Sequence, residues 1–263
     1  MPTVTSADGT RIAYDRHGDG GPAMIRVGGA LSYRKFKKFE QIAPALSEHC
    51  TVINYRRRGR ADSGEAGPVS VEHEVEDIAA LIEAVGSRAS LRGWSSSGAL
   101  SLRAGGADIG VEKVVDYETP FETDPTARYP TNDDGARLEE SVATGDRTAA
   151  AKAFMRNGVG LPRSLVAVMP RMPMFKKLAA NGHTLTFDYV ALGDHNMHVA
   201  PARRGVGGRH LSDVGRLWDE DGGRAQALIA RSRRCSRTRR CANSRERITM
   251  SRRARSRRSW RSS

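Results

Sequence analysis

Short apolar or β-branched runs recur along the first 120 residues of the chain. They predict strands at residues 23–27, at residues 51–55, around Ala89 and Leu91, and at residues 111–117. Two further runs, at residues 2–6 and 10–15, flank Asp8-Gly9, which is a strong hairpin-turn signal.

Helical patterns lie between these predicted strands. Residues 36–48 carry apolar side chains at helical spacing. In residues 72–85, a stripe of Val75, Ile78, Ala79, Ile82 and Val85 predicts an amphipathic helix closed by Gly86. Alternation of strand and helix predicts an α/β fold with a parallel sheet and right-handed crossovers.

Residues 121–198 show another pattern. Pro-rich turns separate short helical pieces at residues 137–142, 148–155 and 165–169, and no strand pattern is evident. We therefore divide the chain into an α/β core (residues 1–120), an inserted helical cap (121–198) and a tail (199–263).

The tail holds all of the excess positive charge. The formal net charge is +13, but residues 200–263 alone contribute 19 Arg, no Lys and five acids. The remainder of the chain has a net charge of −1. The last Lys is Lys177 and the last Tyr is Tyr189, so the composition changes near residue 199.

The tail is expected to be disordered. Residues 231–263 contain 14 Arg, eight Ser and one acid, which leaves too little apolar surface to form a core. Arg-rich segments bind phosphate backbones, but Trp260 is the only Phe, Tyr or Trp within residues 231–263, so base stacking has little support there and a nucleic-acid partner is not expected. An Arg-rich nucleic-acid-binding protein and a non-enzymatic ligand binder remain as alternative functions.

Other features concern location and cofactors. Residues 1–20 contain no apolar signal-peptide core, and no run approaches the roughly 18 apolar residues of a membrane span. Three cysteines (Cys50, Cys235 and Cys241) do not suggest a disulfide framework. We expect a cytoplasmic protein with no membrane partner, no metal and no redox cofactor.

The segment Gly93-Trp94-Ser95-Ser96-Ser97-Gly98 carries the strongest chemical signal. A serine between small residues, at a strand-to-helix turn, has the sequence form of a nucleophile elbow. The strict pattern ends in Gly, where this chain has Ser97. The alternative is a Ser/Gly-rich loop in which a serine caps the following helix.

The order of motifs resembles the α/β-hydrolase superfamily, in particular its small soluble bacterial members with a helical cap. Residues 27–31 (Val-Gly-Gly-Ala-Leu) stand at the family's oxyanion loop. Residues 55–64 resemble its Asp-x-Arg-Gly-x-Gly-x-Ser loop, and residues 115–121 resemble its Tyr-Glu-Pro-Pro-Phe segment. With residues 93–98, the resemblance covers about residues 3–198.

The resemblance implies Ser95 as the nucleophile of an acyl-enzyme mechanism on a small ester or amide-like substrate. Backbone N–H groups of Ser96 and of Gly29 or Ala30 would form the oxyanion hole. A neutral serine hydroxyl is a poor nucleophile, so a histidine oriented by a carboxylate must accept its proton.

The acid and the base depart from this pattern. Glu118 is the best remaining candidate acid, although a structural carboxylate at the cap hinge is the alternative. The family's Gly-x-x-His near the C-terminus is missing: the last histidine is His210, and His183, His195 and His198 lie in the cap. We therefore expect little or no hydrolase activity.

Several charged residues also depart from the family pattern. Arg26, Arg92 and Asp116 interrupt strands that should be buried on both faces, where an unpaired charge is costly. One explanation is an ion pair between Arg92 and Asp116; relaxed selection or a sequence error is the other. Arg56 stands where the family loop has Asp, and Ala61 replaces a glycine.

A shifted reading frame is our hypothesis for the tail, because a GC-rich gene read out of frame yields Arg, Ala, Gly and Ser. Codons that start at the third base of the preceding residue turn Ile248-Thr249 into His and Met250-Ser251 into Val. With suitable third bases, the shifted frame across residues 245–251 encodes Gly-(Ala or Thr)-x-His-Asn-Val. This sequence contains the histidine that the family pattern requires. The fold would be incomplete at its C-terminus.

Overall fold

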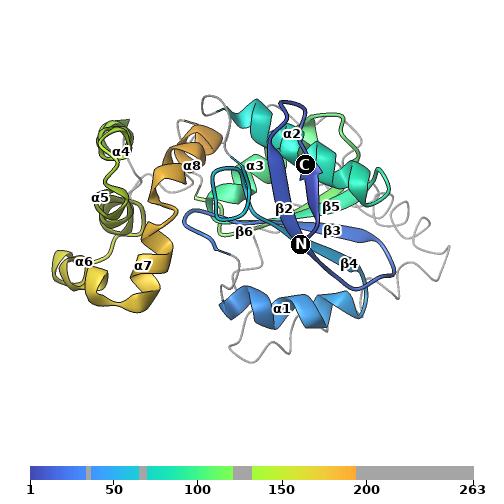
Figure 1. The fold of residues 1–263 in the computed structure, drawn as a ribbon, viewed down its shortest axis with the longest axis horizontal. Helices are drawn as coiled ribbons and strands as arrows, with labels where there is room; N and C mark the ends of the chain where they lie inside the picture. The colour runs from blue at the N-terminus through green and yellow to red at the C-terminus, as the bar shows by residue number, and fades with distance from the viewer. Residues whose placement is uncertain (34–36, 65–69, 121–131, 194–263) are drawn as a thin grey trace, which may run out of the picture. The chain divides into compact units, whose positions relative to one another are not determined.

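A six-stranded mixed sheet forms the centre of the computed structural model (Figure 1), which describes residues 1–33, 37–64, 70–120 and 132–193. The strand order is β1-β2-β4-β3-β5-β6. Strands β3 to β6 are parallel to one another, whereas β1 and β2 are antiparallel, as the predicted hairpin requires. The strands are Thr3–Thr5, Arg11–His17, Ala23–Val27, Thr51–Tyr55, Ala89–Trp94 and Val111–Tyr117. The predicted α/β class is therefore confirmed.

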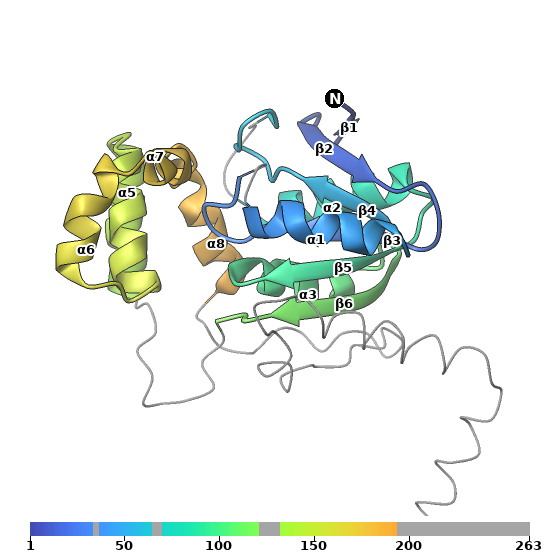
Figure 2. The same cartoon turned by 90° about the horizontal axis from the view of Figure 1, so that it is seen from below.

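Three helices flank this sheet. Helix α1 (Lys37–Ser47) lies on one face, and α2 (Val71–Ala84) and α3 (Ser96–Gly106) lie on the other (Figure 2). Ser70 caps the start of α2, because its side chain accepts the N–H of Glu72, and Gly86 follows the end with φ +111°.

The buried face of α2 differs from the predicted stripe. Ile78 and Ile82 are buried as expected, but Leu81 joins them and Val75 is only partly buried. Two acidic residues, Glu74 and Asp77, are buried as well. The helix therefore presents carboxylates, and not only aliphatic side chains, toward the core.

The charged strand residues are not paired with one another as predicted. The register sets Gly93 opposite Asp116 and Arg92 opposite Val115, so Arg92 and Asp116 point to opposite faces of the sheet. The predicted Arg92–Asp116 ion pair is therefore wrong. Asp116 lies on the α3 side, where a Cβ on Gly93 would stand 2.6 Å from Asp116 Oδ1.

Arg92 instead lies beside Arg26, its register partner on the neighbouring parallel strand. Arg26 is 3% exposed. Burial, with the nearby charge of Arg92, lowers the pKa of Arg26 to about 9. Burial also lowers the pKa of Arg92. Two adjacent strands thus bring like charges together inside the protein.

Residues 132–193 form a group of helices with its own apolar cluster. Helix α4 (Asn132–Ala143) and helix α5 (Arg147–Ala153) continue through a π-helical turn η1 (Phe154–Gly158) to α6 (Arg163–Val168) and a 3₁₀ turn η2 (Met169–Arg171). Helix α7 (Pro173–Ala179), a 3₁₀ turn η3 (Gly182–Thr184) and α8 (Leu185–Leu192) follow. The three predicted helical pieces are present, while α7 and α8 were not predicted. Helix α8 also contacts α3 of the α/β core.

Several predictions concern residues outside the described ranges. These include residues 121–131 at the start of the predicted cap, the tail at 199–263 and the incomplete C-terminal part of the fold. Within the described ranges, the chain has no helix of the length and apolar character needed to cross a bilayer.

Candidate active site

Ser95 occupies a sharp turn between β5 and α3. Its backbone has φ 57° and ψ −135°, a conformation that a residue with a Cβ rarely adopts. Its N–H donates to the carbonyl of Tyr117 at 2.9 Å, which anchors the turn to the end of β6. Its side chain makes no helix-capping hydrogen bond. The geometry therefore fits an elbow better than the alternative of a helix-capping serine.

Small residues allow this turn. A Cβ on Gly93 would lie 2.6 Å from Gly98 Cα, and one on Gly98 would lie 1.8 Å from Thr119 Oγ1. Ser97 is fully buried, and its hydroxyl donates to the carbonyl of Val27 at 2.7 Å. Serine is thus accommodated where the strict motif has glycine.

The loop after β3 lies against Ser95. A Cβ on Gly29 would stand 2.5 Å from the carbonyl oxygen of Trp94 and 3.4 Å from Ser95 Cβ. The N–H of Ala30 donates to Ser96 Oγ at 3.0 Å. Ser96 Oγ in turn donates to Asp188 Oδ1 of α8 at 2.8 Å. One of the two expected oxyanion donors of this loop therefore already has an acceptor.

A buried ion network surrounds that loop. Arg57 donates to both carboxylate oxygens of Glu74 at 2.6 Å and forms an ion pair with Asp188. Although burial would lower the pKa of Arg57, the charges of Asp188 and Glu74 raise it well above its usual value. Arg57 thus connects the loop after β4 with α2 and with α8.

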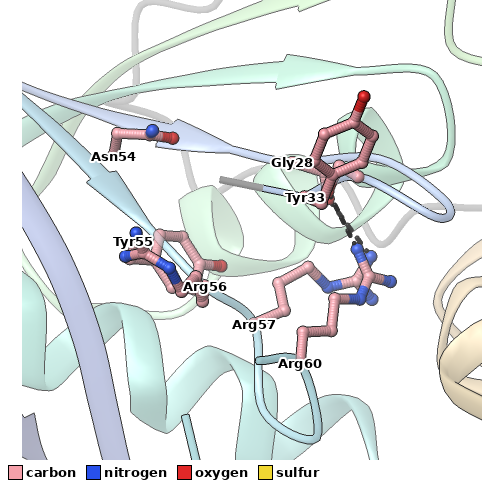
Figure 3. A pocket seen from close by; sticks show the side chains of 8 residues that line it. Gly28, Tyr33, Asn54, Tyr55, Arg56, Arg57 and Arg60 are labelled. Carbon is pink, nitrogen blue, oxygen red and sulfur yellow. Dashed lines mark hydrogen bonds between the residues drawn. The ribbon is translucent and has the colours of Figure 1, made fainter. Parts of the chain in front are cut away.

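Arg60 makes the second half of the network. It donates to Asp188 Oδ2 at 2.8 Å and to Thr184 Oγ1 at 2.9 Å. It also donates to the carbonyl of Gly29 at 2.7 Å and to Ser32 Oγ at 3.0 Å. Figure 3 shows the side chains of Arg57 and Arg60 converging on the loop at Gly28. The loop beside Ser95 is therefore held from both the core and the cap.

A cavity of about 20 Å³ lies beside these arginines, enough for about one water molecule. It is too small for an ester substrate. Its lining residues are Gly28, Ser32, Tyr33, Asn54, Tyr55, Arg56, Arg57 and Arg60.

Ion pairs and hydrogen bonds hold the loop after β4 against the rest of the core. Arg58 pairs with Asp77 at 2.7 Å and with Asp8 at 2.8 Å, and Ser63 Oγ donates to the carbonyl of Arg56 at 2.7 Å. Arg56, at the position of the family's Asp, pairs with Asp15 at 3.0 Å.

Glu118 comes one residue after the carbonyl that anchors Ser95. Its backbone has φ 53° and its side chain is exposed. Nearby, Asp116 is directed toward α3, and its Oδ1 has no hydrogen-bond partner among the described residues. Burial raises the pKa of Asp116 to about 7.

The described histidines do not hydrogen-bond to Ser95. His17 pairs with Val52 near the start of β4, and His49 precedes that strand, so both lie at the amino end of the parallel strands. His183 Nε2 lies 2.8 Å from the carbonyl oxygen of Gly59. His195 and His198 fall outside the described residues.

The sequence prediction missed Asp188 and Thr184. A charged residue inside the apolar run of α8, and Glu74 inside the apolar pattern of α2, were the available signals. In the part of the chain that the structure describes, no three His, Cys, Asp or Glu side chains are grouped to hold a metal ion.

Comparison with solved structures identifies a clear relative. An α/β hydrolase from Sphaerobacter thermophilus DSM 20745 is 41% identical with a TM-score of 0.69, and the match covers 75% of this chain and 76% of that chain. No protein-family model matches, and no curated protein does.

Two more distant structures share the fold. A hydrolase from Pseudomonas aeruginosa PA01 is 22% identical with a TM-score of 0.55, over 74% of this chain and 73% of that chain. An enol-lactonase from Burkholderia xenovorans LB400 is 18% identical with a TM-score of 0.54, over 73% and 74% respectively.

Proposed function

The chain belongs to the α/β-hydrolase family, and from that premise we propose that it is built as a serine hydrolase for small ester or amide-like substrates, with Ser95 as nucleophile. The observation that carries this proposal is the backbone of Ser95. A conformation of this kind costs about 1–3 kcal/mol and is found mainly where a site requires it.

The chemistry would proceed through an acyl-enzyme. Ser95 Oγ attacks the substrate carbonyl carbon while a base accepts the hydroxyl proton, and the tetrahedral intermediate expels the alcohol or amine, which takes up that proton. Water then attacks the acyl group and releases the acid, which returns Ser95 to its starting state.

The oxyanion would be held by the backbone N–H groups of Gly29 and Ser96. Gly29 lies against Ser95, and Ser96 is the first residue of α3, whose N–H has no acceptor within the helix. Ala30 is the weaker choice in this conformation because its N–H donates to Ser96 Oγ. Glu118 remains our candidate for the acid that orients the base.

We propose that turnover is impaired because the base is missing. None of the histidines in the described ranges hydrogen-bonds to Ser95, and the cap histidine His183 contacts the loop after β4. The reading-frame hypothesis places the missing histidine in the DNA that encodes residues 245–251. Stop codons in that frame, or no His codon, would contradict the hypothesis.

Hydrolysis of p-nitrophenyl acetate tests the proposal in two proteins: the chain as it is, and the chain with the shifted frame restored. We expect no steady turnover in the first. In the second we expect turnover that Ser95→Ala abolishes and that Ser164→Ala, at an exposed serine of α6, leaves unchanged.

Two results would contradict parts of the proposal separately. Steady turnover by the unrestored chain that is lost in Ser95→Ala would refute the impairment but support the nucleophile. Turnover that survives Ser95→Ala in either protein would refute the nucleophile.

A further inference from the structure

One part of the cap differs in charge from the rest of the globular sequence. Between Asp146 and Asp188 there is no Asp or Glu, but there are seven Lys or Arg. Because residues 1–199 together have a net charge of −1, this concentration is local. Six of the seven are exposed and make no ion pair with a described residue. Arg147 donates to the carbonyl of Ala180 at 3.0 Å, and the other five are Arg156, Arg163, Arg171, Lys176 and Lys177.

The same segment exposes large apolar side chains. Of the eight that are exposed in the described ranges, five lie within residues 159–174, and each of these five is 42–53% exposed. They are Val159, Leu165, Val168, Met172 and Met174. We call these five residues and the five basic ones the cap surface.

The cap surface is distinct from the interior of the cap. Val166, Met169 and Phe175 point inward and are buried in the apolar cluster of the cap helices. Leu165 and Val168, three residues apart, share the outer side of α6. Helices α6 and α7 both contact η2, so these apolar side chains come from neighbouring elements (Figure 2).

We propose that the cap surface docks on an anionic phospholipid bilayer. Exposed Leu, Val and Met side chains would enter the boundary between headgroups and acyl chains, and the surrounding Lys and Arg would meet lipid phosphates. Met suits such a boundary because its unbranched, polarisable side chain adapts to irregular surroundings.

The positive charge of the cap surface and the kinds of residues in it favour an anionic bilayer over two other possible partners, a second copy of the chain and a nucleic acid. A second copy of the chain would bring an equally basic surface, and like charges repel. A nucleic acid would find no exposed aromatic side chain among the ten residues on which to stack its bases. This inference goes beyond the proposed hydrolase function and does not depend on Ser95. It departs from the sequence-based expectation of no membrane partner, which rested on the lack of a membrane-spanning run and did not consider the surface of the cap.

Vesicle sedimentation with the full chain tests the proposal. The probes are phosphatidylcholine vesicles with and without phosphatidylserine, at about 0.05 M and about 0.5 M salt. The Arg-rich tail is expected to bind anionic vesicles by charge alone, and high salt screens such binding. The part of the binding that persists at high salt therefore reports the apolar contact.

The variant Leu165→Ser/Val168→Ser/Met172→Ser tests the apolar residues of the cap surface. We expect its partition to phosphatidylserine vesicles at high salt to fall at least tenfold. The control is Val115→Ser/Val190→Ser, which changes exposed apolar residues elsewhere and should leave partition unchanged. All positions are exposed, and thermal melts check that the variants fold.

The variant Lys176→Gln/Lys177→Gln tests the basic residues of the cap surface. At low salt each lost charge should weaken partition about fivefold. The control Arg11→Gln/Arg88→Gln removes two exposed charges outside the cap and should have a smaller effect.

The proposal is overturned if the cap variants and the unmodified chain partition equally at both salt concentrations, or if the chain does not bind phosphatidylserine vesicles. A change in oligomeric state without a change in partition would identify a second copy as the occupant. A change only in the KM of the frame-restored enzyme would identify the surface as a substrate entrance.

Discussion

Ser96 Oγ donates a hydrogen bond to Asp188 Oδ1 at 2.8 Å, which joins the residue after Ser95 to the last described helix of the cap. The same hydroxyl accepts the N–H of Ala30. The position of α8 and the geometry of the elbow are therefore coupled through one buried carboxylate.

Asp188→Ala should strongly destabilise the protein. It leaves the guanidinium groups of Arg57 and Arg60 buried without the carboxylate they share, and removal of one partner from such a pair costs about 3–5 kcal/mol. Urea denaturation measures the free energy of unfolding. Glu112→Gln breaks the largely exposed pair with Arg88 and should cost less than about 1 kcal/mol. Equal costs for the two variants would contradict a structural role for the network.

Ser95→Gly should stabilise the chain. Gly adopts φ 57° and ψ −135° without the clash of a Cβ, which should gain about 1 kcal/mol after the greater flexibility of the unfolded chain is counted. Ser95→Ala keeps the Cβ and should change stability little. As a control, Ser90→Gly, in the regular part of β5, should destabilise by about 1 kcal/mol. Loss of stability in Ser95→Gly would show that the turn is not strained.

The elements of the core were predictable from sequence because their apolar residues form either a short continuous run, typical of a buried strand, or a stripe at helical spacing. Strands β3 to β6 appeared as apolar runs, and the small residues from Gly93 to Gly98 marked the elbow between β5 and α3. Helix α8 was not predictable in this way. Leu185, Phe187, Asp188, Ala191 and Leu192 are buried around several sides of it, so it has no single apolar stripe.

The site was predictable only in part, because its polar contacts join distant segments. Asp188 meets Ser96 and Arg57 across 92 and 131 residues, and a single sequence carries no record of such pairs. The failed Arg92–Asp116 pairing has a related cause. Side chains alternate between the faces of a sheet, so a one-residue difference in register decides whether two of them meet.

Gly93→Ala should prevent the elbow from closing. Its Cβ would lie 2.6 Å from both Gly98 Cα and Asp116 Oδ1, and backbone at the centre of the sheet has little room to shift. We expect a loss of at least about 2 kcal/mol. Gly106→Ala, in the last turn of α3, is the matched control because nothing lies within 4 Å of its Cβ, and it should be neutral or stabilising. Thermal or urea denaturation of both variants compares them directly.

Asp116→Asn should stabilise the protein above neutral pH and change it little in acid. A carboxyl in the unfolded chain titrates near pH 4, whereas burial raises the pKa of Asp116 to about 7 in the folded protein. Between about pH 4 and pH 7 the Asp116 carboxyl is therefore protonated in the folded protein and ionised in the unfolded chain. Its contribution to stability is complete at low pH and falls as pH rises through about 4 to 7. The gain in Asp116→Asn should grow over that window to about 2–4 kcal/mol, measured by urea denaturation at a series of pH values. Asp19→Asn, which removes a carboxylate that is almost fully exposed, is the control for the loss of a negative charge in itself. A gain for Asp116→Asn that is independent of pH would mean that this carboxyl titrates as it does in water.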